Sequence, residues 1–241
     1  MIHLVSDIHL QAEGPETVGL FGRYLSGQAR RAKALYILGD LFEYWPGDDC
    51  LDDPDSFESR ICGRLRQLAE GGTAIFFLAG NRDFLAGGRF AAASGARLLA
   101  EPHVADIEGR RALLLHGDTL CTDDLKYQAF RRTIRSDNWR TSFLDRPLAD
   151  RLAEIAALRE RSRQEIGEKP ADIMDANGEA VAAAFREHGV DRLVHGHTHR
   201  LGHHLHVVDG SERQRWVLGD WGRSGNLLAC EGDDWRFKTV K

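Results

Sequence analysis

Five short hydrophobic runs of this 241-residue chain end in the same way. Each run is rich in Ile, Leu, Val or Phe, and an Asp, Asn or His follows it with a glycine nearby. The runs are residues 2–6, 34–38, 73–79, 111–115 and 191–194. Runs of this length and composition predict buried strands. In open α/β sheets, ligands bind beyond the carboxyl ends of the strands, so we expect the five endings to meet at one site.

Helical patterns lie between several of these runs. Residues 15–31 and 54–70 are long enough for helices, and each segment begins at a proline, which favours helix starts. This alternation indicates an α/β architecture. Gly and Asp separate three later runs, which predicts an antiparallel sheet from residues 205–208, 215–218 and 227–230. We therefore expect two sheets packed face to face, with helices outside.

One segment, residues 122–170, contains no strand signal. Its apolar residues form two helical stripes, Leu125/Phe130/Ile134 and Leu152/Ile155/Leu158. It carries eleven Lys/Arg against nine Asp/Glu, whereas the rest of the chain has a net charge of −7. A basic helical insertion in an acidic protein suggests a lipid surface or an anionic ligand, and the alternative is a solvated hairpin held by ion pairs. The predicted units are a core of residues 1–121 and 171–241 and an insertion of residues 122–170.

Charge and cysteine content narrow the class of protein. A net charge of −5 argues against a general nucleic-acid binder. The four cysteines are scattered without C-x-x-C spacing, so we expect neither a disulfide framework nor a zinc cage. The chain opens on an apolar run without a charged leader, and no window approaches the length of roughly 18 apolar residues that a membrane span needs. We therefore expect a cytoplasmic protein.

The strand endings supply oxygen and nitrogen donors that suit metal ions. Seven donors are too many for one ion, and with one bridging carboxylate they suit two ions about 3.5–4 Å apart. A mixed Asp, Asn and His set without cysteine fits Mn²⁺, Fe²⁺ or Zn²⁺ in a reactive site better than Ca²⁺, Mg²⁺ or structural zinc. The candidate ligands are Asp7, His9, Asp40, Asn81, His116, His197 and His199. His195 is a candidate for orienting a ligand, and we interpret the other histidines as structural.

The motifs Asp-x-His, Gly-Asp, Gly-Asn-x-Asp, His and Gly-His-x-His, in this order over residues 7–199, resemble the calcineurin-like metallophosphoesterase superfamily. The resemblance implies a four-layer αββα sandwich of two mixed sheets, with a dinuclear metal site at the strand ends and the insertion as a helical lid. It implies a first metal held by Asp7, His9, Asp40 and His199. It implies a second metal held by Asp40, Asn81, His116 and His197, and catalytic roles for Asp40, Asn81, Arg82 and His116.

Arg82, which follows Asn81, limits the kinds of phosphate bond that we expect the protein to cleave. A guanidinium group can bind phosphate through two parallel hydrogen bonds, but it cannot donate a proton at a useful pH. Many members of the superfamily that hydrolyse phosphomonoesters carry a histidine here, as a candidate proton donor. A phosphate leaving group, with a second pKa of about 6, needs no proton. The arginine therefore favours cleavage of a pyrophosphate bond.

A finer resemblance is to the UDP-2,3-diacylglucosamine hydrolase family of lipid A synthesis. It rests on residues 39–43, 80–84, 116–124, 173–175 and 195–199, and the run His-Gly-Asp-Thr-Leu-Cys-Thr-Asp-Asp at 116–124 is its most specific part. It implies hydrolysis of UDP-2,3-diacylglucosamine to UMP and 2,3-diacylglucosamine 1-phosphate with two Mn²⁺ per chain. The implied substrate contacts are Asn81, Arg82, Asp124, Ser162, Lys169 and His197. Ile166 departs from the family, which usually has a polar residue there.

The same resemblance implies peripheral binding to the cytoplasmic face of the inner membrane, because a substrate with two acyl chains resides in the membrane. We also expect a monomer. The candidate acyl-chain contacts are apolar lid residues, with packing inside the lid as the alternative: Trp139, Phe143, Leu144, Leu152 and Ile155.

Three other functions are compatible with part of the metal-ligand motifs. A hydrolase of cyclic nucleotides or dinucleoside polyphosphates would use the same metals, but a small soluble nucleotide needs no amphipathic lid. A scaffold with structural metals would usually have lost ligands, whereas all seven positions carry donors. A nuclease is disfavoured by the net charge of −5.

Overall fold

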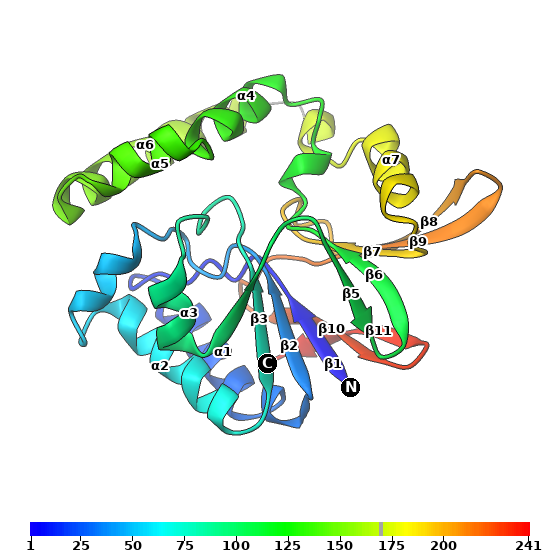
Figure 1. The fold of residues 1–241 in the computed structure, drawn as a ribbon, viewed down its shortest axis with the longest axis horizontal. Coiled ribbons are helices and arrows are strands. Elements are labelled where there is room, and N and C mark those ends of the chain that lie inside the picture. The colour runs from blue at the N-terminus through cyan, green and yellow to red at the C-terminus, as the bar shows by residue number, and fades with distance from the viewer. Residues whose placement is uncertain (169–170) are drawn as a thin grey trace.

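The computed structural model describes residues 1–168 and 171–241, with side chains described for residues 1–159 and 173–241. Its strands form two sheets that lie face to face (Figure 1). The first sheet has the order β11-β10-β1-β2-β3-β4, and the second has the order β5-β6-β7-β9-β8. The strands are β1 Ile2–Val5, β2 Ala34–Leu38, β3 Ala74–Leu78, β4 Ala96–Leu99, β5 His103–Ile107, β6 Arg110–Leu114, β7 Arg192–His195, β8 Gly202–Val208, β9 Ser211–Val217, β10 Gly225–Glu231 and β11 Asp234–Val240.

Helices cover the outer face of each sheet (Figure 1). Three of them pack on the first sheet: α1 Pro15–Ser26, α2 Phe57–Glu70 and α3 Gly88–Ser94. The second sheet is covered by α7 Gly178–His188. The order helix, sheet, sheet, helix is the four-layer αββα sandwich that the sequence predicted. The remaining helices, α4 Leu125–Ile134, α5 Asp137–Leu144 and α6 Leu148–Glu168, lie together beyond the sheets (Figure 1).

The central strands are buried on both faces, which explains why their sequences are continuously apolar. In β2, Leu35 and Ile37 belong to the cluster under the helices of the first sheet. Tyr36 and Leu38, which alternate with them, belong to the cluster between the two sheets. Since successive side chains of a strand point to opposite faces, a two-sided core needs apolar residues at every position.

Local sequence signals place the helix ends. The hydroxyl of Ser56 accepts a hydrogen bond from the backbone N–H of Ser59 and caps α2, so this helix begins at Phe57 rather than at the predicted residue 54. Gly27 ends α1 at Ser26, and residues 29–31 form a separate 3-10 turn. The predicted helix over residues 15–31 was therefore too long.

The prediction of one antiparallel sheet from the three C-terminal runs was wrong. β10 pairs antiparallel with both β1 and β11 in the first sheet. β9 belongs to the second sheet, where it pairs parallel with β7 and antiparallel with β8. The C-terminal segment is thus divided between the sheets, and β1 gains a partner from near the end of the chain. The sequence analysis also missed α3, α7, β4, β5 and β11.

The helical segment packs onto the core instead of projecting from it. Phe143 is only 3% exposed and belongs to the main hydrophobic cluster, against which Trp139 and Ile155 also pack. Leu144 and Leu152 are each 38% exposed. Three of the five candidate acyl-chain residues therefore pack on the core, and the other two are partly exposed. Among the described residues, none of the helices combines the length and the apolar character needed to span a bilayer.

Candidate active site

Five of the predicted ligands come together at the ends of β1, β2, β3, β6 and β7. The Oδ1 atom of Asn81 lies between Nε2 of His116, at 2.8 Å, and Nδ1 of His197, at 2.9 Å. The same Nε2 of His116 is 3.6 Å from Oδ2 of Asp40. Ligand-bearing atoms of Asp7, Asp40 and His116 all lie within 4.8 Å of one another.

The remaining two ligands lie on the other side of Asp7. The Nε2 atom of His199 is 3.4 Å from Oδ1 of Asp7 and 3.4 Å from Nε2 of His9. Oδ2 of Asp40 is 3.9 Å from the Nε2 of His9. Asp7 therefore belongs to both groups of donors, and Asp40 lies between His9 and His116. All seven predicted ligands lie in one cluster, formed from strand ends that are up to 190 residues apart in sequence.

The backbone is strained at five of the seven predicted ligands. Asp7, His9, Asp40, His197 and His199 all have positive φ angles, between 53° and 64°. They are five of the seven non-glycine residues with positive φ in the described part of the chain. For residues with a Cβ this conformation costs roughly 1–2 kcal/mol each, and such strain gathers at functional sites. The sharp turns after β1, β2 and β7 aim these side chains at one point.

Glycines allow the ligand loops to approach one another closely. Gly39 has φ of +87°, and a Cβ there would lie 2.5 Å from the Cα of Gly80 and 2.6 Å from Nδ1 of His116. A Cβ at Gly196 would collide with the carboxylate of Asp7 and the hydroxyl of Ser6. The glycines beside the ligands in the sequence motifs therefore have a steric function: side chains at these positions would displace the donors.

The charges of the cluster suit bound cations. Burial lowers the pKa of His116, but the buried carboxylates of Asp40 and Asp7 outweigh burial and raise it to about 9. Burial and the charge of His116 lower the pKa of His197 to about 4, so its imidazole is neutral at pH 7. Carboxylates that stabilise a buried imidazolium also favour a metal cation, and a neutral imidazole has a free lone pair for it. The donor set of carboxylates, one amide and imidazoles therefore fits divalent transition metals.

Hydrogen bonds orient the side chains of His116 and Asp7 within the cluster. Nδ1 of His116 lies 2.9 Å from the carbonyl oxygen of Leu38, so Nε2 is the nitrogen that faces the cluster. The hydroxyl of Ser6 donates to Oδ2 of Asp7 at 2.5 Å. Backbone N–H of His197 also donates to the Asp7 carboxylate, at 3.0 Å. The donors are thus oriented by groups around them.

His195 lies behind the cluster and supports it. Its side chain is fully buried, and Arg215 donates a hydrogen bond from Nη1 to Nε2 of His195 at 3.1 Å. Its Nδ1 lies 2.8 Å from the carbonyl oxygen of Gly196. Burial and the charge of Arg215 lower the pKa of His195 to about 3, so the imidazole is neutral and donates through Nδ1. This geometry agrees with a residue that orients the loop carrying His197.

The predicted substrate contacts are only partly described. The backbone N–H of Arg82 donates to Oδ1 of Asp40 at 2.8 Å, and its guanidinium has no carboxylate within 4 Å among the described side chains. Asp124 is buried and caps α4 by accepting a hydrogen bond from the backbone N–H of Tyr127. Ser162 and Lys169 lie outside the residues whose side chains are described, as does Ile166.

The sequence analysis missed two acidic residues that support the site. Asp83 is fully buried and accepts hydrogen bonds from the backbone N–H groups of Gly80 and Leu41, both at 2.8 Å. The signal for this residue was the last position of the Gly-Asn-x-Asp motif. Oε2 of Glu43 lies 3.1 Å from Nδ1 of His9. It follows Asp40 by three residues in a segment that resembled the hydrolase family, but no spacing rule marked it.

A buried polar network connects α4 to the site. The hydroxyl of Tyr127 and Nε of Arg131 donate to one oxygen of the buried Asp118, at 2.8 and 2.6 Å. Arg131 also reaches Glu101, whose other carboxylate oxygen accepts from the backbone N–H of His116 at 2.7 Å. The first helix of the insertion is therefore tied to the strand end that carries a predicted ligand.

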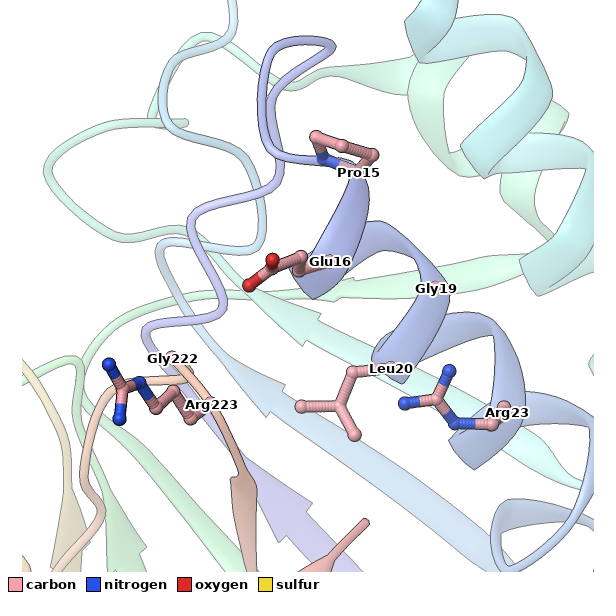
Figure 2. Close-up of a pocket in the computed structure, with 7 residues that line it drawn as sticks. All are labelled: Pro15, Glu16, Gly19, Leu20, Arg23, Gly222 and Arg223. Atoms are coloured by element: carbon pink, nitrogen blue, oxygen red, sulfur yellow. The ribbon is translucent and has the colours of Figure 1, made fainter.

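A separate pocket of about 300 Å³ lies beside α1, lined by Pro15, Glu16, Gly19, Leu20, Arg23, Gly222 and Arg223 (Figure 2). None of the predicted site residues lines this pocket.

Comparison with protein families decides how the cluster is classified. Residues 1–201 match the model of the calcineurin-like phosphoesterases, which spans all seven clustered donors. The chain belongs to this family. The match spans β1 to β7 and residues 122–170, and it ends before β8.

Similar proteins share nearly the full length of the chain. A UDP-2,3-diacylglucosamine hydrolase from Aromatoleum aromaticum is 49% identical over 228 residues, which is 95% of this chain and 92% of that protein. A UDP-2,3-diacylglucosamine hydrolase from Pseudomonas putida (strain W619) is 45% identical over 241 residues, which is 100% of this chain and 99% of that protein. Among solved structures, Vps29 from Entamoeba histolytica in complex with Zn²⁺ is 15% identical, with a TM-score of 0.44 over 99% of this chain and 97% of that chain.

Proposed function

We propose that this chain hydrolyses the pyrophosphate bond of UDP-2,3-diacylglucosamine. Water attacks the α-phosphorus, the bond from that phosphorus to the bridging oxygen breaks, and the products are UMP and 2,3-diacylglucosamine 1-phosphate. The observation that carries the proposal is the convergence of seven oxygen and nitrogen donors at the strand ends of a calcineurin-like phosphoesterase. The choice of substrate is supported by relatives of that name that are 45–49% identical over nearly the whole chain.

The cluster would hold two divalent cations, for which we propose Mn²⁺. Asp7, His9, Asp40 and His199 would bind the first ion, and Asp40, Asn81, His116 and His197 would bind the second. Bound ions of this kind act as Lewis acids, which lower the pKa of water and neutralise negative charge on phosphoryl oxygens. The strained backbone and the surrounding hydrogen bonds fix the donors before any ligand arrives, so little reorganisation is needed when charge develops in the reaction.

Arg82 and Asn81 are the proposed phosphate contacts within the chain. The backbone of Arg82 is held by Asp40, while its guanidinium lacks an ion-pair partner among the described side chains. A guanidinium at this position can bind phosphoryl oxygens through two hydrogen bonds. Since the leaving group is a phosphate, the reaction needs no proton donor at this residue.

Residues 122–170 are the proposed lid for the glucosamine and acyl groups, with Asp124, Ser162 and Lys169 as substrate contacts together with His197. Leu144 and Leu152 are the better candidates for acyl-chain contact, because they are partly exposed, whereas Phe143 is buried in the core. We also propose that the protein is a monomer that binds the cytoplasmic face of the inner membrane, where a substrate with two acyl chains resides.

The test is release of UMP from UDP-2,3-diacylglucosamine in detergent, with Mn²⁺ and with EDTA, by the wild type and by Asp40→Ala. We expect metal-dependent hydrolysis that the substitution abolishes. Hydrolysis of a soluble nucleotide or an aryl phosphodiester, with none of the glycolipid, would keep the metal site and reject the substrate. Metal binding without hydrolysis of any of these compounds would indicate a scaffold with structural metals.

A further inference from the structure

His9 has a different partner on each side of its ring. Its Nε2 faces the ligand cluster, 3.4 Å from Nε2 of His199. Its Nδ1 faces away from the cluster and lies 3.1 Å from Oε2 of Glu43. A carboxylate in this position fixes the tautomer and the orientation of a metal-binding histidine and increases its basicity. The carboxylate of Glu43 thus lies on the side of the His9 ring that faces away from the cluster, as the carbonyl of Leu38 does at the ring of His116.

The second oxygen of Glu43 contacts the lid. Oε1 of Glu43 lies 3.1 Å from Nη2 of Arg159, a residue of α6. The same nitrogen donates to Oε1 of Gln11 at 3.0 Å, and the guanidinium lies over the ring of Tyr44, 5.3 Å from its centre. Glu43 and Arg159 are each only partly exposed, at 17% and 19%, so water screens their attraction less than on an open surface.

Helix α6 is fixed to the same loop at a second point. Arg151 is 1% exposed, donates from Nη1 to the carbonyl oxygen of Pro46 at 2.6 Å and pairs with Asp49. Ile155, between the two arginines, packs against the main hydrophobic cluster. Residues four and eight positions apart recur along one side of a helix, so this side of α6 faces the core. Of the two anchors, only Arg159 reaches a residue that touches a predicted ligand.

We propose that Glu43 is a positioning residue that orients His9 and, through Arg159, couples the position of the lid helix to the first metal. The inference rests on the proposed metal site and not on the identity of the substrate. Coupling of this kind is reciprocal: if the lid contact strengthens metal binding, then the metal stabilises the docked lid by the same factor. The chain would therefore close its lid more firmly once the site is loaded.

The experiment measures Mn²⁺ affinity by competition with a chelating indicator, and amide hydrogen exchange in α6 with and without Mn²⁺. We expect Glu43→Ala to weaken binding of the first ion about 10–100-fold, the usual effect of removing the partner of a metal-binding histidine. Arg159→Ala should weaken it about fivefold and abolish the slowing of α6 exchange by Mn²⁺. Glu43→Gln keeps an acceptor for Nδ1 but loses the charge that attracts Arg159, so it should retain more metal affinity than Glu43→Ala and still lose the effect of metal on α6.

The matched control is Arg132→Ala, an exposed lid arginine with no ion pair among the described side chains, which should bind Mn²⁺ like the wild type. Circular dichroism establishes that each variant is folded. A folded Glu43→Ala protein with wild-type Mn²⁺ affinity would overturn the positioning role. An Arg159→Ala protein in which Mn²⁺ still slows α6 exchange would overturn the coupling. None of these measurements uses the glycolipid, so a failed hydrolysis assay leaves the inference standing, whereas a wild type that binds no Mn²⁺ would remove the metal site and the inference together.

Discussion

Asp83 lies directly behind Asp40, and the backbone N–H of Asp40 points at its carboxylate, 3.3 Å from Oδ1. Oδ1 also accepts from Gly80, and Oδ2 accepts from Leu41. One buried carboxylate therefore joins the loop after β2 to the loop after β3. Burial and the nearby charge of Asp40 raise the pKa of Asp83, and the backbone N–H groups oppose this by stabilising its charged form.

We expect Asp83→Ala to destabilise the fold and the metal site together. The substitution leaves buried N–H groups without partners, so the free energy of unfolding should fall by at least about 2 kcal/mol. Urea unfolding measures this, and Mn²⁺ affinity should fall in the folded protein. Asp55→Ala removes an exposed carboxylate and serves as the control. Equal stability of the two variants would show that the hydrogen bonds of Asp83 contribute nothing.

Gly196→Ala should abolish metal binding, because the added methyl group would collide with the carboxylate of Asp7 and displace it. Gly63→Ala makes the same chemical change in the middle of α2, where a Cβ meets no atom within 4 Å. That control should stabilise the protein by up to about 1 kcal/mol, since alanine is the better helix former. Titration with Mn²⁺ and thermal unfolding separate the two effects. Normal metal binding by Gly196→Ala would contradict the steric function of the glycine.

Removing Arg151 should loosen the attachment of α6 to the core without a direct effect on the candidate metal ligands. Arg151→Ala leaves the carbonyl of Pro46 and the carboxylate of Asp49 without this partner, so we expect a loss of about 2 kcal/mol in unfolding free energy. Amide exchange in α6 should accelerate. Arg151→Lys should recover part of the stability, because an ammonium group can reach only some of the same acceptors. Exchange rates in α6 like those of the wild type would show that other contacts hold the helix.

Arg82→Lys tests the phosphate contact in the proposed reaction. Loss of two parallel hydrogen bonds to phosphate should lower kcat/KM for the glycolipid by about tenfold or more. Mn²⁺ affinity should stay the same, since the backbone of residue 82 still donates to Asp40. Steady-state kinetics measure the change in kcat/KM, and metal titration measures the Mn²⁺ affinity. A lysine variant with unchanged kcat/KM would remove Arg82 from the set of substrate contacts.

His3 should make the protein less stable in mild acid. Burial, with the charges of Lys238 and the N-terminus, lowers its pKa from 6.5 to about 4. Between these values the unfolded chain binds a proton that the folded chain does not, so the stabilisation is complete above pH 6.5 and is lost as the pH falls toward 4. His3→Leu should show a smaller loss of urea resistance between pH 7.5 and pH 5, measured in EDTA so that metal release does not contribute. An unchanged loss would assign the acid sensitivity to other groups.

The layers and the clustering of the seven donors could be predicted from the sequence, because both follow from local patterns. Strands such as β2 are apolar at every position since both faces are buried, and the candidate ligands follow these strands directly in the sequence. The division of the C-terminal strands between two sheets could not be predicted. The pairing of β10 with β1 joins segments far apart in the sequence, and no local pattern specifies which distant strand pairs with which. The packing of the helical insertion on the core could not be predicted for a related reason. Nothing in the helical pattern marks Arg151 as buried or distinguishes Phe143, which packs on the core, from the exposed Leu144.

The pairing of β1 with β10 has a consequence for synthesis of the chain. The first two candidate ligands, Asp7 and His9, follow β1, yet one neighbour of this strand in the sheet begins only at Gly225. The carboxylate of Asp7 likewise accepts a hydrogen bond from the backbone N–H of His197, which lies 190 residues later in the sequence. Contacts of such sequence separation form late, after the entropy of closing a long loop has been lost. A ribosome must therefore release the chain past His199 before the donors can come together, and a nascent chain halted short of β10 would leave the edge of β1 open to other strands.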